Sequence, residues 1–281
     1  AARCFPPAPH GGSRDEGRVV STPVMASSPE VDAIVARAET LSNDLSLEAV
    51  KAWKAAVPGR KAIGWLPVLL QQSGNAKVQA GQVGNFAAAD FVRKLEVPTQ
   101  LDRSQGDVHA AGNPHIQTDP RNIAQVAPAL GARLQQVDPA HAADYAKRLA
   151  DFMQRWQQAM NRWNALAAPL KGLSVASQHK GFAYLYDWLG LKEVAVLEPK
   201  PGIEPSASHL QSVLSTLKAT PARMVLYAAY QDSRPSEWLS RNAAIPAVKI
   251  PFTVGGSEGA NDLFGLFDDT LARLLAAGAA R

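Results

Sequence analysis

Apolar residues recur at helical spacing between residues 139 and 168, which is the most regular stretch of the chain. The residues of this stripe stand three or four positions apart: Tyr145, Leu149, Phe152, Trp156, Met160, Trp163 and Leu166. That spacing places them on one face of a helix. Asp138 suits the N-cap of this helix, and Pro139 suits its first position. At ~1.5 Å per residue the helix would be about 45 Å long, enough for a rigid spine that joins two lobes.

After Gly172, short β-type runs alternate with segments of helical character. The runs LSVAS, VAVLE, MVLYA and AVKIP occupy residues 173–177, 194–198, 224–228 and 247–251. A helix is expected between each pair of runs, and a last one over roughly residues 259–277. Strands that alternate with helices predict parallel βαβ units. Right-handed crossovers then place helices on both faces of the sheet.

The first part of the chain has a different pattern. Residues 5–30 are rich in Pro, Gly and Ser, which is typical of loops, and residues 30–56 predict two short helices. The segment KAIGWLPVLL predicts a strand that runs into a helix, and AKVQAG, at residues 76–81, predicts a short extended segment. Residues 102–122 predict a long, turn-rich loop with two histidines, and loops of that length are often functional.

Composition narrows the chemistry that the chain can carry. The chain has 281 residues, 46% of them hydrophobic, which is enough for a sizeable core and excludes disorder for most of its length. The one cysteine, Cys4, excludes an internal disulfide and a cysteine-rich metal site, so any metal must use His, Asp or Glu. The net charge of +4 is mild and no dense basic block occurs, which argues against nucleic acid as a partner. No apolar run approaches the ~20 residues of a membrane span.

Two histidines stand where a ligand would bind. Ligands of parallel α/β sheets bind beyond the carboxyl ends of the strands, and His179 lies where the first β-type run gives way to a helix. His115 follows the tight turn Gly-Asn-Pro at residues 112–114, and His109 precedes it on the same loop. Each could instead be an ordinary capping or surface histidine.

Other kinds of chemistry find less support in the sequence. The chain lacks a Walker loop, a GxGxxG segment, a GxSxG elbow and an HExxH motif. An acid–base pair drawn from Glu198, Glu204 and Asp232 stays open as an alternative.

Several motifs together resemble one family. GNPHIQTDPRN, the long helix, QHKGFAYLYDWLGL, EPKPGIEPSASHL and PFTVGG follow one another in this order. From about Gly64 to the C-terminus the chain thus resembles the zinc/manganese-type solute-binding proteins of bacterial ABC importers, the TroA-like group. The resemblance implies an α/β fold with two lobes joined by one long rigid helix, a metal held between them, a membrane permease as partner and a periplasmic location. Imidazole ligands favour Zn²⁺ over Mn²⁺.

The resemblance also points to individual ligands. His115 matches the histidine of a GxPHxWxDPxN-type loop, and His179 matches the histidine of an HxAFxYF motif. A further first-lobe histidine of the family has no counterpart, and Val254 stands where the family often has an aspartate, for which Glu258 or Asp262 could substitute. The candidate metal ligands are therefore His115, His179, His109 and Glu258.

The expected organisation follows from these motifs. Residues 1–62 form an atypical segment, 63–137 the rest of an N-terminal lobe that could be incomplete, 138–169 the spanning helix and 170–281 the C-terminal lobe. Within the first segment, VKAWKAAVPGRKAIG is faintly similar to subunits of 2-hydroxyacyl-CoA dehydratases and benzoyl-CoA reductases. We expect a monomeric binding protein and no enzyme. The alternatives are a hydrolase in which the metal activates water, and a remnant with an incomplete metal site.

Overall fold

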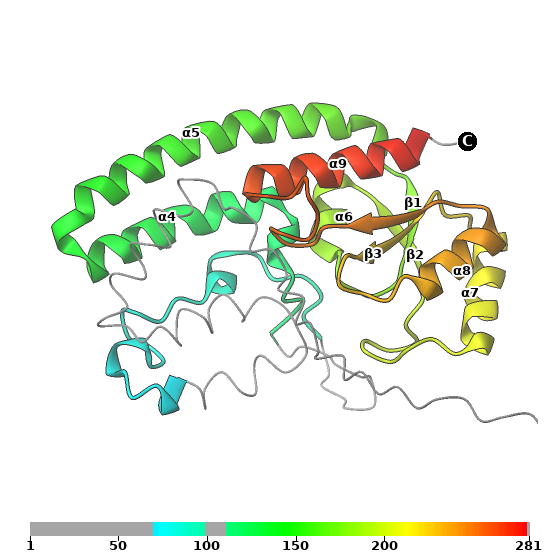
Figure 1. The fold of residues 1–281 in the computed structure, drawn as a ribbon, viewed down its shortest axis with the longest axis horizontal. Coiled ribbons are helices and arrows are strands. Elements are labelled where there is room, and N and C mark those ends of the chain that lie inside the picture. Colours follow the sequence, from blue (N-terminus) through cyan, green and yellow to red (C-terminus); the bar gives the residue numbers. More distant parts are fainter. Residues whose placement is uncertain (1–69, 99–110, 280–281) are drawn as a thin grey trace, which may run out of the picture.

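The computed structural model describes residues 70–98 and 111–279, and Figure 1 shows how their elements are arranged. The expectations for residues 1–62, and that for His109, lie outside the described residues. Two long helices, α4 and α5, lie together at one end of the molecule, and a small sheet with its helices forms the other.

The sheet has the parallel topology that the sequence predicts. Its strands are β1 (Ser174–Ser177), β2 (Lys192–Val196), β3 (Val225–Ala228) and β4 (Ala247–Ile250). Each neighbouring pair is parallel, and the spatial order is β2-β1-β3-β4. The strand β2 begins and ends two residues earlier than the apolar run suggested, because the exposed Lys192 and half-buried Glu193 pair with β1.

Helices cover both faces of this sheet, as expected from right-handed crossovers. They are α6 (Ala183–Leu189), α7 (Ala207–Ala219), α8 (Arg234–Ala243) and α9 (Leu263–Ala279). The core on one face contains buried side chains of α6 and α9, and the core on the other contains those of α7 and α8. Strands β1, β3 and β4 contribute side chains to both apolar layers, because successive residues of a strand point to opposite faces of the sheet.

The long helix is confirmed as α5 (Ala142–Ala167), with a 3-10 turn at each end, Pro139–His141 and Ala168–Leu170. Trp156 and Trp163 are fully buried, as the aromatic stripe predicts. Leu166 is 48% exposed, so it does not belong to the stripe.

The start of this helix differs from the prediction in one respect. The side chain of Asp138 makes no capping bond to the backbone. Its Oδ2 atom instead accepts hydrogen bonds from the His141 ring (2.8 Å) and the Tyr145 hydroxyl (3.0 Å).

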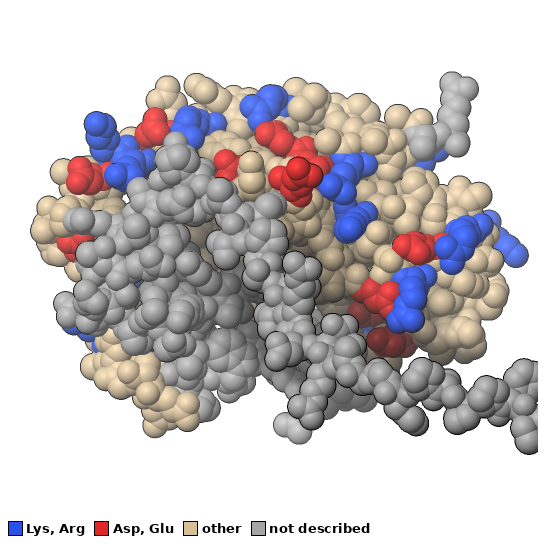
Figure 2. Space-filling view, in the orientation of Figure 1, with Lys and Arg blue, Asp and Glu red and all other residues tan. Residues whose placement is uncertain are grey.

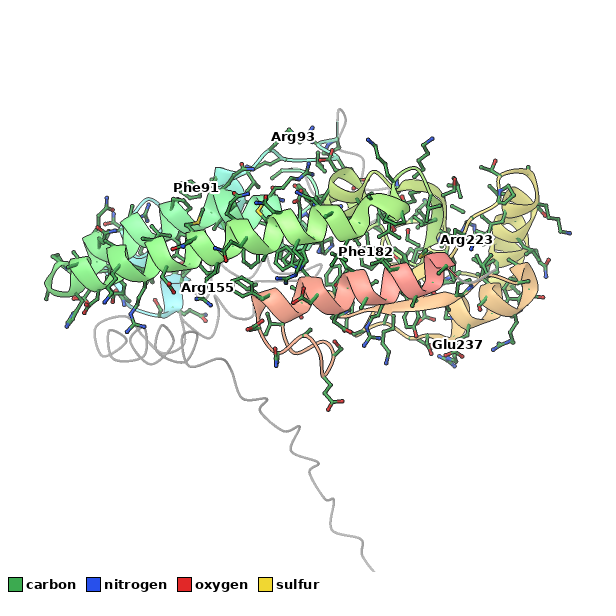
Figure 3. The ribbon with its side chains drawn as sticks, turned by 90° about the horizontal axis from the view of Figure 1, so that it is seen from above. Phe91, Arg93, Arg155, Phe182, Arg223 and Glu237 are labelled. Atoms are coloured by element: carbon green, nitrogen blue, oxygen red, sulfur yellow. The ribbon has the colours of Figure 1, made fainter. Side chains whose placement is uncertain are left out.

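Helix α5 packs against α4 (Pro120–Val137) along its first part and lies beside α9 along its second. Figure 3, seen from above, shows α5 running along much of the described molecule, with α9 beside its second part. One helix thus contacts both halves of the described molecule.

The described residues that precede α4 contain 3-10 helices and no strand. These are η1 (Ala76–Val78), η2 (Ala88–Phe91) and η4 (Ile116–Thr118). The segment AKVQAG was expected to be extended, but the side chain of Asn75 accepts a hydrogen bond from the Lys77 N–H and starts a helical turn there. The Arg133 guanidinium of α4 donates to the carbonyls of Val83 and Asn85, which ties this segment to the helix.

Two further features of the molecule are the distribution of charge on its surface and the apolar character of its helices. Figure 2 shows that on one face Lys and Arg side chains lie beside Asp and Glu side chains, so the described residues there form no large patch of one sign. Within residues 70–98 and 111–279 no helix combines the length and the apolar character that crossing a bilayer requires.

Candidate metal-binding site

Two histidines from distant parts of the chain meet at the carboxyl end of the sheet. His179 lies two residues beyond the end of β1, and His115 is the residue directly before η4. Their ring centroids are 5.9 Å apart, and their planes are inclined by 80°. His115 is 5% exposed, and the side chain of His179 is 12% exposed. The structure therefore brings together the two histidines that the motifs single out.

A carboxylate holds the ring of His179. Oε2 of Glu198 lies 2.7 Å from Nδ1 of His179 and also accepts the backbone N–H of Gly202 at 2.6 Å. An ionised carboxylate can only accept hydrogen bonds, so Nδ1 of His179 is the donor, and in the neutral form of the ring Nε2 then keeps its lone pair. A histidine that donates one ring N–H to a carboxylate and offers the other nitrogen is the usual arrangement around protein-bound metals.

The sequence suggested Glu198 only for acid–base chemistry, and its hydrogen bond to the ring of His179 was not predicted. The sequence held only part of the signal: Glu198 ends the β-type run at 194–198, but only the structure shows that β2 is the sheet neighbour of β1. The Glu198 N–H donates to the carbonyl of Gln178 at 3.0 Å, which extends the strand pairing up to the histidine.

The side chain of Asn113 connects the two histidine loops. Its Oδ1 accepts the backbone N–H of His115 at 3.0 Å, and its Nδ2 donates to the carbonyl of Lys180 at 3.1 Å and to Oε2 of Glu96 at 2.8 Å. Asn113 is 8% exposed. One buried amide therefore fixes the backbone of His115 relative to the residue that follows His179.

The turn before His115 requires glycine. Gly112 has φ +94°, and a Cβ on it would lie 2.7 Å from the carbonyl oxygen of Leu95. The Tyr184 hydroxyl of α6 donates to the carbonyl of Asn113 at 2.9 Å and accepts the N–H of Leu95 at 3.1 Å. The rigid turn that the Gly-Asn-Pro segment predicted is therefore present, and α6 helps to hold it.

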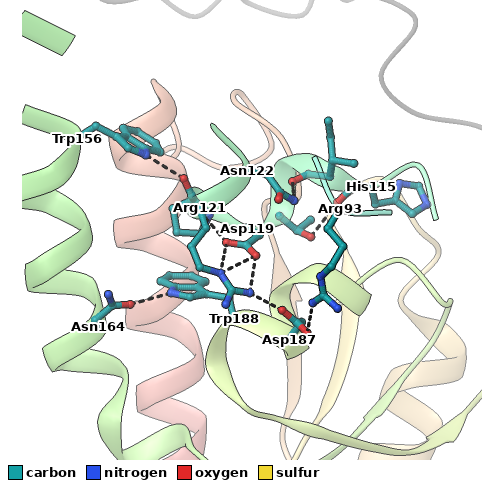
Figure 4. A network of polar contacts seen from close by, with 12 residues as sticks. Arg93, His115, Asp119, Arg121, Asn122, Trp156, Asn164, Asp187 and Trp188 are labelled. Carbon is teal, nitrogen blue, oxygen red and sulfur yellow. Dashed lines mark hydrogen bonds and ion pairs between the residues drawn. The ribbon is translucent and has the colours of Figure 1, made fainter. Parts of the chain in front are cut away.

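A network of charged residues joins α6 to the start of α4 (Figure 4). Asp119, which caps α4, and Asp187 of α6 both accept hydrogen bonds from Arg121. Arg93 donates to the other oxygen of Asp187 at 2.8 Å. Burial acts to raise the pKa of Asp187, but the hydrogen bonds from Arg121 and Arg93 outweigh it and lower the pKa below its ordinary value.

Comparison with known proteins places this fold and site in a family. The model of the zinc-uptake complex component A periplasmic family, ZnuA, matches residues 57–277. The chain belongs to the ZnuA family. The match covers most of the chain, including both histidine loops and all four strands of the sheet.

Curated relatives of this ZnuA-family chain are distant. The zinc-binding protein AdcA of Streptococcus pyogenes serotype M6 is 21% identical over 190 residues, which are 68% of this chain and 36% of that protein. The high-affinity zinc uptake system protein ZnuA of Bacillus subtilis is 22% identical over 130 residues, which are 46% of this chain and 41% of that protein. The chain thus spans well under half the length of these curated relatives.

Solved structures share the fold of this ZnuA-family chain. A crystal structure of ZnuA superposes with a TM-score of 0.60 at 19% identity and covers 79% of this chain and 77% of its own. The solute-binding protein FpvC of Pseudomonas aeruginosa, in complex with Mn²⁺, superposes with a TM-score of 0.59 at 22% identity, over 78% and 76% of the two chains. The expected two-lobe α/β fold is thereby confirmed.

Among the described residues, Glu258 is not grouped with His115 and His179. His109 lies outside the described residues, and Glu258 is exposed on the loop between β4 and α9. Oδ1 of Asp262 accepts the N–H of Gly265 at 2.7 Å and so caps the start of α9, while Val254 is 44% exposed. In the part of the chain that the structure describes, no three His, Cys, Asp or Glu side chains are grouped as a metal site. The third and fourth ligands stay predictions.

The carboxylates that suggested acid–base chemistry have separate partners. Glu198 is bound to His179, whereas Asp232 accepts a hydrogen bond from Nε of Arg234 at 2.6 Å. That bond lowers the pKa of Asp232 below its ordinary value. Glu204 is exposed on the loop after β2.

Proposed function

We propose that this chain is the solute-binding component of an ABC metal importer, which captures Zn²⁺ and delivers it to a membrane permease. The observation that carries the proposal is the meeting of His115 and His179, with Glu198 holding the Nδ1 side of the His179 ring. Membership of the ZnuA family and the names of the relatives, a zinc-binding protein and a zinc uptake protein, support the same cargo.

The ring geometry suits a shared zinc ion. Two imidazoles on one tetrahedral zinc, with Zn–N bonds of ~2.0–2.1 Å, have ring centroids ~5 Å apart. The observed centroid separation of 5.9 Å requires only a small approach of His115 and His179. Imidazole nitrogen prefers zinc to manganese, which favours oxygen ligands.

The further metal ligands, the helix between the lobes and the location of the protein are proposed from the family pattern. His109 and Glu258 are the candidates for further coordination, and water can complete the tetrahedron. Residues 138–169, which include α5, would form the rigid spine between an N-terminal lobe and the C-terminal lobe of residues 170–281. We place the protein on the outer side of the membrane, in the periplasm, as a monomer that hands its metal to the permease.

The proposal is tested by measuring Zn²⁺ affinity in competition with a chelator of known affinity. We expect His115→Ala and His179→Ala each to weaken zinc binding at least about tenfold, because each removes one of few ligands. His141→Ala is the matched control, since its ring contacts Asp138 and lies on the turn before α5. Circular dichroism confirms that each variant is folded.

Two results would overturn the proposal. Unchanged zinc affinity in both histidine variants would show that the histidines are not the ligands. Metal-dependent turnover of ester or phosphate substrates by the wild type, lost in the same variants, would instead favour the hydrolase alternative.

A further inference from the structure

Phe252, in the loop after β4, has an unusual backbone conformation. Its φ is +70°, in the left-handed region that side chains other than glycine rarely adopt. It is only 2% exposed, so the ring is packed inside the protein. Strained residues of this kind persist only where the surrounding structure holds them, and they concentrate at functional sites.

A tight turn fixes this conformation. The N–H of Gly256 donates to the carbonyl of Thr253 at 3.0 Å, and the N–H of Gly255 donates to the carbonyl of Ala260 at 2.7 Å. A Cβ on Gly256 would lie 1.9 Å from the carbonyl oxygen of Pro251, so only glycine allows the backbone to close there. The loop therefore leaves Phe252 little freedom to turn its ring elsewhere.

The ring of Phe252 lies against both histidine loops. Its centroid is 5.0 Å from that of His115, at an interplanar angle of 66°, which is an edge-to-face contact. A Cβ built on Gly181 would lie 3.2 Å from Cε2 of Phe252 and 3.3 Å from Cδ2 of His179. The absence of a side chain at Gly181 thus leaves the space in which the phenyl ring approaches the site.

We propose that Phe252 is a positioning residue of the metal site, which holds the imidazole of His115 in its metal-binding orientation. The inference rests on the proposed function. The backbone of His115 is fixed by Asn113, and its imidazole is in edge-to-face contact with the ring of Phe252. This contact restricts rotation of the imidazole about its side-chain bonds. A ligand ordered before the metal arrives loses less entropy on binding, and the affinity rises accordingly.

The test compares Phe252→Leu with Phe267→Leu. Phe267 is also 2% exposed, but its ring contacts are with Trp156, Trp163 and Trp188. We expect Phe252→Leu to weaken binding of Zn²⁺ about threefold to tenfold, the range of an aromatic pair contact. We expect Phe267→Leu to lower the melting temperature and leave the zinc affinity of the folded protein unchanged.

A spectroscopic readout separates positioning from a general loss of stability. In the metal-free protein the ring-proton NMR signals of His115, assigned with His115→Gln, should shift in Phe252→Leu because the ring current of the phenyl group is lost. They should stay unchanged in Phe267→Leu. If Phe252→Leu does not fold, Phe252→Met replaces it, since an unbranched side chain fills irregular space.

Wild-type affinity and unmoved His115 signals in the Phe252 variant would overturn the inference. A wild type that binds no zinc would overturn the proposed function instead. The NMR comparison would then still report whether the ring of Phe252 lies against that of His115.

Discussion

At the scale of single residues, Glu198 has the most consequential contacts of the site. Its carboxylate binds the ring of His179 and the backbone of Gly202, and its side chain is only 10% exposed. Because Nδ1 of His179 is occupied in this way, Nε2 is the nitrogen available to a metal. If His179 binds a metal as proposed, Glu198 thus selects which atom of the histidine is the ligand.

We therefore expect Glu198→Gln to weaken zinc binding about tenfold or more, as loss of an outer carboxylate partner commonly does. The amide removes the negative charge and can present an N–H to Nδ1 of His179 in place of an acceptor. Chelator competition measures the change. Glu237→Gln, on the exposed face of α8, is the control and should leave the affinity unchanged. Equal affinities for the two variants would contradict the role assigned to Glu198.

At the scale of elements, α6 connects the two ends of the described molecule. It begins shortly after His179, and its Tyr184 hydroxyl bonds to the backbone at Leu95 and at Asn113. One turn later, Asp187 binds Arg93 and Arg121 (Figure 4). The helix that follows one histidine is thereby fixed to the loop that carries the other.

Asp187→Asn should destabilise the protein at neutral pH by about 0.5–1 kcal/mol, because the two arginine bonds lose their charged partner at a partly exposed site. That loss corresponds to a melting temperature lower by about 1–4 °C. Asp151→Asn, whose side chain is 65% exposed beside Arg155, is the control and should change little.

The difference in stability between the wild type and Asp187→Asn should depend on pH in one direction. The pKa of Asp187 is lowered in the folded protein from its ordinary value of 3.8. Its contribution is therefore fully present above pH ~4 and is lost as the pH falls through the lowered folded value. Thermal melts of wild type and Asp187→Asn should converge in that acidic range. A difference that stays constant down to the lowest pH would contradict the assignment.

At the scale of the whole molecule, α5 and the two cores of the sheet hold the site in place. The core that α5 shares with α6 and α9 contains the fully buried Trp156 and Trp163, and the second core lies on the other face of the sheet under α7 and α8. A rigid scaffold of this kind keeps the histidine loops near their bound positions. Metal binding should then stabilise the folded state as a whole.

We expect saturating Zn²⁺ to raise the melting temperature of protein first stripped with EDTA. A ligand present at ~100 times its Kd stabilises the folded state by ~2.7 kcal/mol, which is about 5–10 °C for a protein of this size. His179→Ala should show a smaller shift. Unmoved melting of the wild type would favour the remnant with an incomplete site.

Much of this fold follows from local sequence patterns. The stripe around Trp156 predicts α5, and the apolar runs after Gly172 predict the parallel sheet. Burial of one helix face or of a whole strand requires apolar residues at the positions that are buried, and this pattern can be read in the sequence. Position at a strand end was enough to single out His179. The turn before His115 is also local, since the Gly-Asn-Pro segment predicts it and Gly112 has the φ of +94° that glycine adopts readily.

Contacts between distant segments produce no periodic pattern in the sequence from which they could be predicted. Nothing periodic in the sequence indicates that Glu198 reaches His179, that Asn113 spans to Lys180, or that Phe252 lies against His115. These contacts depend on the order of strands in the sheet and on where the loops meet. The sequence by itself determined most of the elements and singled out the two histidines; only the tertiary structure decided that Glu198 contacts Nδ1 of His179 and that Phe252 packs against the ring of His115, because these contacts join segments far apart in the chain.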